Sequence, residues 1–244
     1  MAKLTIKLMS YNIHFGTDSS GAPTLPRIME TIAEAGPDIV FLQEVDKHWS
    51  RRSGFADQTK LLSETLGLSV VYGANLDLDP PVPGAPRRQY GTAILSKHPI
   101  MESRNYPLNS FGDEQRGLLE AEIELSADGP SIRAYNIHMG LTARQRIAQV
   151  EDATQIIGRK SGPVVLAGDF NAEPDSLELR LLREAGFVDS LAGLAAGPTF
   201  PSTAPESRID YIWTRGNLSV DSAAVLPSMA SDHCPIVGEY VMSY

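Results

Sequence analysis

Two short stretches of the chain place an acid close to an amide or an imidazole, and a third carries an acid alone. Gly168-Asp169-Phe170-Asn171 sets an acid and an amide two residues apart, and in an extended segment both side chains point to the same side. Ser231-Asp232-His233 sets an acid beside an imidazole. Ile209-Asp210-Tyr211 adds an acid in an apolar run, a plausible orienting partner for a histidine. Phosphoryl chemistry needs such a set, because it uses oxygen ligands for a hard cation, a carboxylate that activates water, and donors that neutralise charge on phosphorus.

An internal repeat predicts how the chain positions these groups. Residues 11–16 are Tyr-Asn-Ile-His-Phe-Gly and residues 135–140 are Tyr-Asn-Ile-His-Met-Gly, and each copy ends an apolar, β-prone run. Each is followed by a helix-like stretch, a Gly-Pro pair and a short apolar strand that ends on an acid, Glu44 or Asp169. The spacing from asparagine to acid is 32 residues in the first copy and 33 in the second. We therefore expect two β–helix–β halves whose asparagine, histidine and acid lie at corresponding strand ends.

The remaining elements fit two sheets with helices outside them. Strands are expected at residues 4–11, 38–42, 90–96, 100–108, 118–125, 132–135, 164–167, 208–214, 218–226 and 235–242. Helices are expected at residues 26–35, 57–66, 142–159 and 175–185. The proline-rich residues 79–88 are expected to form a long loop, which in compact proteins is often the rim of a site. Continuous apolar strands indicate sheets that are covered on both faces.

Composition limits the class of protein. A chain of 244 residues, 42% of them hydrophobic, can bury a substantial core, and we expect one catalytic domain over residues 1–244 and a monomer. The formal net charge of −9 disfavours long nucleic acid as a partner but not a small phosphate substrate. A single cysteine, Cys234, excludes an internal disulfide framework and a multi-cysteine zinc site. Without a transmembrane run or a signal-peptide pattern, a cytoplasmic location is expected.

Six motifs, in this order, resemble those of the endonuclease/exonuclease/phosphatase superfamily, which includes pancreatic deoxyribonuclease and neutral sphingomyelinases. They are Ser10-Tyr11-Asn12, Gln43-Glu44, Tyr135-Asn136-Ile137-His138, Gly168-Asp169-Phe170-Asn171, Ile209-Asp210-Tyr211 and Ser231-Asp232-His233. Each motif is weak alone, but six in order across residues 4 to 237 are a specific match. The resemblance implies a four-layer α/β/β/α sandwich of two packed mixed β-sheets flanked by helices. It also implies a hydrolase of phosphate esters that uses Mg²⁺, with Mn²⁺ as a substitute.

The resemblance assigns a metal site and a water-activating acid to particular positions. It implies that Glu44 is the principal metal ligand, with Asn12 next to it. Asp232 would assist metal binding, directly or through water. Asp169 would orient and activate the attacking water, and Asn171 would give a hydrogen bond to phosphate or metal. Whether one metal ion or two act stays open.

The same resemblance assigns a set of phosphate contacts. His233 would contact the phosphate, with Asp210 holding its ring, and His138 would donate to a non-bridging oxygen. Arg116 matches a position where many relatives carry a basic residue, and we expect it to contact the phosphate. His14 echoes His138 in the repeat, so a role in substrate binding stays open, although a structural role is the simpler interpretation.

The motifs leave the substrate open. The paired histidines and the majority chemistry of the family favour a phosphodiesterase that acts on a small or lipid-headgroup phosphodiester. A phosphomonoesterase and a non-specific or repair-type endonuclease or exonuclease are alternatives. Against a repair enzyme stand the acidic balance and His14, where such relatives usually carry an acid. A non-catalytic binding module on the same fold is disfavoured because Glu44, Asp169 and His233 are all present.

Overall fold

Two pairs of parallel strands, each connected by a helix, form the middle of this computed structural model. The structure describes residues 2–127, 129–192 and 197–244. In the first pair, β1 (Lys3–Asn12) is parallel to β2 (Ile39–Lys47), and α1 (Leu25–Ala35) connects them. In the second pair, β7 (Ser131–His138) is parallel to β8 (Val164–Asp169), and α3 (Ala143–Gly158) connects them. These are the two β–helix–β units that the internal repeat predicts.

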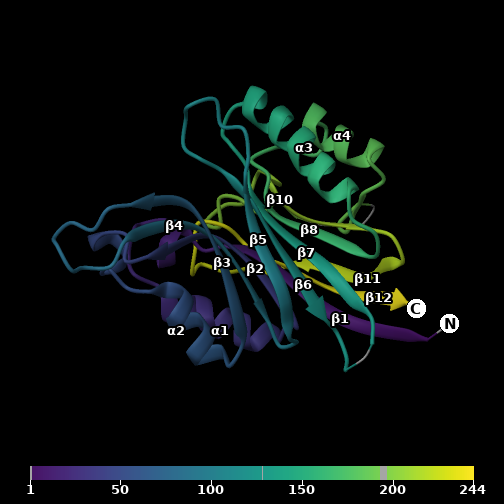
Figure 1. Cartoon of the computed structure of the whole chain (residues 1–244), viewed down its shortest axis with the longest axis horizontal. Coiled ribbons are helices and arrows are strands. Elements are labelled where there is room, and N and C mark those ends of the chain that lie inside the picture. Colours follow the sequence, from purple (N-terminus) through teal and green to yellow (C-terminus); the bar gives the residue numbers. More distant parts are fainter. Residues whose placement is uncertain (1, 128, 193–196) are drawn as a thin grey trace.

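Each unit extends into a six-stranded sheet, and the two sheets repeat the same plan. The first has the order β11-β12-β1-β2-β4-β3, adding β11 (Leu218–Val225), β12 (Ile236–Ser243), β4 (Arg88–Ser96) and β3 (Ser69–Leu78). The second has the order β5-β6-β7-β8-β10-β9, adding β5 (Ile100–Pro107), β6 (Gly117–Glu124), β10 (Asp210–Arg215) and β9 (Val188–Asp189). In both sheets the central pair is parallel and each other neighbouring pair is antiparallel. The C-terminal strand β12 returns to lie beside β1, so the two ends of the chain are neighbours (Figure 1).

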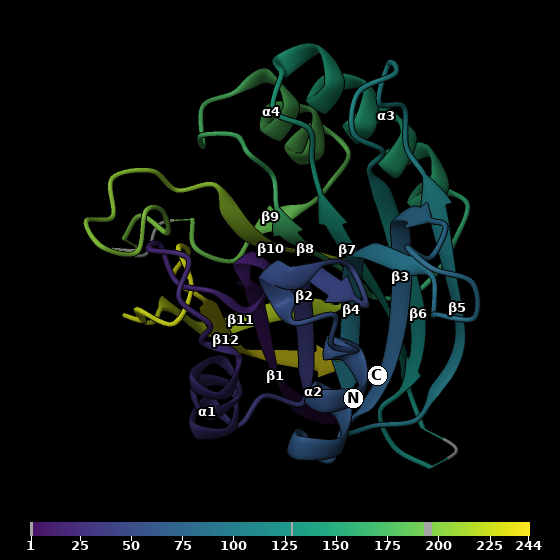
Figure 2. The ribbon, with the colours of Figure 1, turned by 90° about the vertical axis from the view of Figure 1, so that its left-hand side faces the viewer.

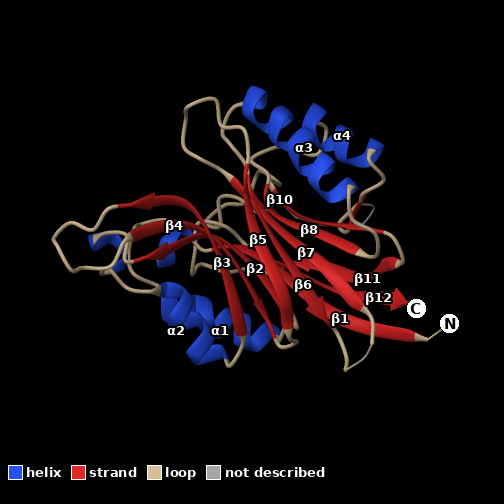
Figure 3. Cartoon of the chain, in the orientation of Figure 1, coloured by secondary structure: helices blue, strands red, loops and turns tan. Residues whose placement is uncertain are grey.

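The sheets pack face to face, and helices cover their outer faces (Figures 2 and 3). Helices α1 and α2 (Gln58–Leu66) lie on the first sheet, and α3 and α4 (Leu177–Glu184) lie on the second. The first four residues of β2 are all apolar because the strand is covered on both faces: Phe41 packs between the sheets, whereas Val40 and Leu42 pack beneath the helices. The predicted four-layer sandwich with two repeated halves is confirmed. No helix in the described part of the chain is long and apolar enough to cross a membrane.

Most predicted elements are found within a few residues of their expected bounds, but two strands were not predicted. Strand β3 contains Gly73 and Asn75, which weaken its β signal; the glycine is needed because the Asn105 side chain lies where a Cβ would be, at 2.8 Å. Strand β9 has only two residues, too few for a pattern. Residues 79–87 join β3 to β4 without a helix or strand, as the prolines predict, and the last residue of the expected loop, Arg88, is the first of β4.

The two asparagines of the repeat have different surroundings. Asn136, on β7, is fully buried, and its Nδ2 donates across the interface between the sheets to the carbonyls of Leu42 and Ala93 at 2.9 and 2.8 Å. Its Oδ1 accepts from Gln43 Nε2 at 2.7 Å. Asn136 therefore joins the two sheets through three hydrogen bonds, whereas Asn12, at the end of β1, lies among acids.

Candidate active site

Strand register in the second sheet places three functional side chains in one row. His138 on β7 is the partner of Asp169 on β8, and Asp169 is the partner of Asp210 on β10. Partners on neighbouring strands point to the same face of a sheet, so the three side chains lie side by side. All three are buried, and His138 Nε2 lies 3.6 Å from Asp169 Oδ2. The row brings together residues from three strands, the outer two of which, His138 and Asp210, are 72 positions apart in the sequence.

The same register corrects one prediction from the repeat. Asn12 pairs with Gln43 and Asn136 pairs with Ala167, so the residue that corresponds to Glu44 is Gly168, not Asp169. The prediction that the two acids occupy corresponding positions is therefore wrong by one residue, as their unequal spacing from the asparagines reflects. The position that Glu44 occupies in the first half and Gly168 in the second has a positive φ in both, 56° at Glu44 and 146° at Gly168. Glu44 lies where the register between β2 and β4 shifts, and this irregularity turns Glu44 out of the regular strand.

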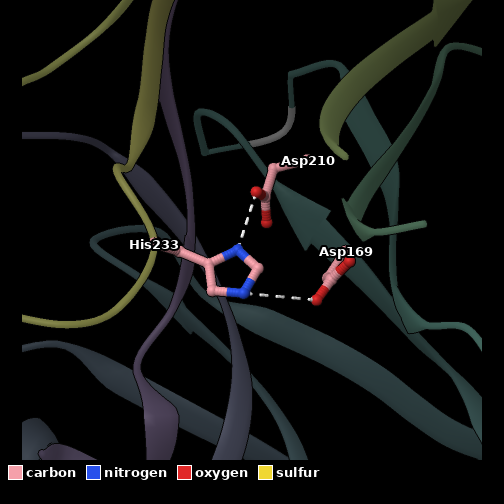
Figure 4. A group of neighbouring side chains, drawn as sticks. All are labelled: Asp169, Asp210 and His233. Carbon is pink, nitrogen blue, oxygen red and sulfur yellow. Dashed lines mark hydrogen bonds and ion pairs between the residues drawn. The ribbon is translucent and has the colours of Figure 1, made fainter. Parts of the chain in front are cut away.

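His233 reaches the row from the loop before β12 (Figure 4). Its Nδ1 lies 2.9 Å from Asp210 Oδ2, and its Nε2 lies 3.8 Å from Asp169 Oδ2. The loop is tied to the first sheet because Ser231 Oγ donates to the backbone carbonyl of Asn12 at 2.8 Å. Two imidazole Nε2 atoms, from His233 and His138, thus face the same carboxylate oxygen.

The two histidines have opposite electrostatic surroundings. Burial alone would lower the pKa of His233, but the carboxylates of Asp210 and Asp169 raise it to about 10. Burial, the guanidinium of Arg116 and the neighbouring His233 lower the pKa of His138 well below its ordinary value. Burial and the nearby Asp210 raise the pKa of Asp169. At neutral pH the site therefore contains one imidazolium and one neutral imidazole beside Asp169, whose pKa is raised to about 7.

Asn12 connects this group to Glu44. Its Nδ2 donates to Glu44 Oε1 at 3.1 Å and to Asp169 Oδ2 at 3.0 Å, so one amide bridges acids from both halves. Its Oδ1 accepts from the backbone N–H of His14 at 3.0 Å. The half-buried Glu44 has no ion pair with a basic side chain among the residues that the structure describes.

The other predicted site residues lie around this centre in different ways. Asn171 donates its backbone N–H to Asp169 Oδ1 at 2.9 Å, and its Nδ2 donates to the carbonyl of Met139. The half-exposed Asp232 lies 3.8 Å from His14 Nδ1. His14 is not in the row because β1 ends before it and the chain turns there, with a φ of 44°.

Arg116 lies beside His138, and its contact with a phosphate stays a prediction. Its side chain is 7% exposed, and its Nη1 lies 3.1 Å from His138 Nδ1 and 2.9 Å from Glu114 Oε1. It therefore contacts the site through His138, and Glu114 balances its charge.

A model of the endonuclease/exonuclease/phosphatase family matches residues 9–233. The chain belongs to this family. Members of the family are hydrolases that act on phosphate esters. The chain is 28% identical over 252 residues to the uncharacterized protein YbhP of Escherichia coli, which covers 97% of this chain and 96% of YbhP.

Solved structures of the endonuclease/exonuclease/phosphatase family share the fold. A family protein from Beutenbergia cavernae matches with a TM-score of 0.85 and 24% identity, covering 98% of this chain and 72% of that one. A mannosyl-6-phosphatase from Bacteroides thetaiotaomicron matches with a TM-score of 0.78 and 19% identity, covering 96% of this chain and 99% of that one. At these identities the likeness concerns the fold.

Two groups in this family member offer ligands for a divalent cation. Asp169, Asp210 and His233 are buried, and their ligand atoms lie within 4.8 Å of one another. In that group His233 Nδ1 donates to Asp210, and a protonated imidazole has no lone pair for a cation. The second group is Glu44 with Asn12. The Glu44 carboxylate is a ligand of the kind that Mg²⁺ prefers, and Asn12 Oδ1, which accepts from the His14 N–H, keeps a second lone pair for a cation. Glu44 forms no ion pair with a basic side chain in the described part of the chain. The Glu44–Asn12 group therefore fits Mg²⁺ better than the group of Asp169, Asp210 and His233 does.

Beside Glu44 lies an arginine that the sequence gave no reason to single out. Arg52 forms a two-point ion pair with the fully buried Asp46, at 2.9 and 2.7 Å, and its guanidinium lies 4.0 Å from the centre of the Phe15 ring. This contact fixes the loop that follows β2 against the turn that follows β1. An Arg-Arg pair in a loop does not indicate in sequence which member is paired.

Proposed function

We propose that this chain is a divalent-metal-dependent phosphodiesterase that acts on a small or lipid-headgroup phosphodiester. The observation that carries the proposal is the buried Asp169 carboxylate, which faces two imidazole nitrogens from residues held in opposite charge states. A carboxylate is the group that accepts a proton from attacking water, and two donors beside it can hold the oxygens of a phosphate.

Each side chain has a defined part in hydrolysis. Asp169 Oδ2 orients a water molecule for in-line attack on phosphorus and accepts its proton. His233 donates from Nε2 to a phosphate oxygen as a cation, because Asp210 holds its Nδ1 proton. His138 donates from Nε2 to a second non-bridging oxygen as a neutral group. Glu44 and Asn12, with Asp232 nearby, would hold Mg²⁺, which supplies Lewis-acid stabilisation of the developing charge when it is bound.

The balance of charge favours a diester over a monoester. A phosphodiester carries one negative charge near neutral pH, whereas a monoester carries close to two. The site provides one imidazolium, and the guanidinium of Arg116 is already paired with Glu114. With the charge of Mg²⁺ balanced by the carboxylates of Glu44 and Asp232, a monoester dianion would need a further cation, so the singly charged ester is the better match.

The test is hydrolysis of bis-p-nitrophenyl phosphate compared with p-nitrophenyl phosphate, each with Mg²⁺, with Mn²⁺ and with EDTA. We expect faster turnover of the diester, its loss in EDTA, and its recovery when either metal is added. Faster turnover of the monoester would overturn the preference for diesters. Equal turnover with and without EDTA would overturn the metal requirement, and plasmid degradation faster than diester turnover would favour the nuclease alternative.

A further inference from the structure

Arg116, which comes directly before β6, is held from three sides. Its backbone N–H donates to Ser110 Oγ at 3.0 Å. Its Nη1 contacts Glu114 Oε1 at 2.9 Å and His138 Nδ1 at 3.1 Å. The arginine and the histidine are both buried, so water does not compete strongly for this contact. The geometry therefore sets which nitrogen of the imidazole carries a proton.

A guanidinium has only N–H donors, has no acceptor, and stays protonated at any ordinary pH. The nitrogen that faces it must therefore accept a hydrogen bond, and an imidazole nitrogen accepts only when it carries no proton. His138 Nδ1 is then unprotonated, and the single proton of the neutral ring is on Nε2. That nitrogen lies 3.6 Å from Asp169 Oδ2, on the side where the substrate phosphate is proposed to bind.

We infer that Arg116 is a positioning residue that fixes His138 as a neutral imidazole with its proton on Nε2, directed toward the substrate phosphate. The tautomer follows from the contact itself, and the direction toward phosphate rests on the proposed function. This role is separate from the direct phosphate contact that the sequence predicts for the arginine.

The partner of Nδ1 is what distinguishes the two histidines. In His233 the Nδ1 faces a carboxylate, Asp210, so it carries a proton and the ring can be a cation. In His138 the Nδ1 faces a cation, so the ring stays neutral. The charged groups around His138 are Arg116, His233 and Asp169, with Glu114 behind the arginine. Two imidazolium rings side by side would repel each other, and Arg116 prevents the second from forming.

The direct test is nuclear magnetic resonance of protein labelled with ¹⁵N in histidine, because nitrogen shifts distinguish protonated from unprotonated ring nitrogens. Between about pH 6 and pH 8, around the ordinary histidine pKa, wild-type His138 is expected to show an unprotonated Nδ1 and a protonated Nε2. In Arg116→Met we expect the single tautomer to be lost and the ring to gain a second proton as the pH falls. Glu114→Gln is the matched control, since it keeps the guanidinium, and its tautomer should match wild type.

Kinetics add a second readout. Arg116→Met is expected to lower kcat about 10- to 100-fold, the range seen when a partner that orients a functional side chain is removed. The Arg116→Met variant should also lose activity as the pH falls. Arg116→Lys should recover part of the kcat and part of the activity at acid pH. A protonated Nδ1 in the wild type, or an Arg116→Met spectrum that matches wild type, would overturn the inference. Because the spectra need no substrate, confirmation of the tautomer without any diester hydrolysis would reject the proposed function alone.

Discussion

Asp169→Asn is expected to reduce diester hydrolysis about 10²- to 10⁴-fold in kcat, the range that a general base contributes. The amide has nearly the shape of the carboxylate, but it cannot accept the proton of the attacking water. Asp169 is also the one acid that faces both imidazole Nε2 atoms and the Asn12 amide, so no neighbour occupies its place. The measurement is kcat for bis-p-nitrophenyl phosphate with saturating Mg²⁺.

Two companion variants make this result interpretable. Asp169→Ala should lose as much activity, because it removes the same base. Asp221→Asn, on the exposed edge strand β11, changes the net charge by the same amount and should keep wild-type kcat. Circular dichroism and thermal unfolding establish that each variant folds. Substantial hydrolysis by folded Asp169→Asn would mean that water is activated elsewhere.

Asp210→Asn is expected to lower kcat about 10²-fold at pH 8, at the low end of the range for acid–base groups, and to move the pH profile. Asp210 raises the pKa of His233 to about 10, so the imidazolium is present below that pH and is lost as the pH rises through it. Without the carboxylate the pKa of His233 falls, and activity that depends on the cation disappears at a lower pH. The measurement is kcat against pH for both proteins.

His233→Ala gives the matching comparison for this prediction. It should be slow at every pH, because no imidazolium is present to lose. Thr199 Oγ1, which accepts from the backbone N–H of Asp210, offers a control in Thr199→Ser, which keeps that hydroxyl. If kcat falls at the same alkaline pH in Asp210→Asn and in the wild type, the assigned role of Asp210 is contradicted.

The architecture could be predicted because its signals are local and repeated. The two YNIH copies, the Gly-Pro pairs and the apolar strands mark each half, and a parallel pair connected by a helix follows from them. Residues of the motifs also come together as expected: Asn12, Glu44, Asp169, Asp210 and His233 meet although they are distant in the sequence. Their assigned roles stay proposals.

What could not be predicted depends on contacts between distant segments. A one-residue difference in register makes Gly168, and not Asp169, the counterpart of Glu44. The sequence carries it as the spacing of 32 against 33 residues, but strand pairing is needed to show which residue is the counterpart. The diverging surroundings of Asn12 and Asn136 arise from sheet packing, which identical motifs cannot show. Arg116 was expected at the phosphate because of its type, but its direction is set by Glu114 and His138 across the fold.

The proposed active site is tested most directly by a crystal structure of the protein with Mn²⁺ and phosphate, in which the metal is located by its anomalous scattering. We expect the metal at the oxygens of Glu44 and Asn12. The phosphate should lie within hydrogen-bond distance of His138 Nε2 and His233 Nε2, with Asp169 beside it. A metal bound instead between Asp169, Asp210 and His233, or a phosphate away from both histidines, would contradict this assignment.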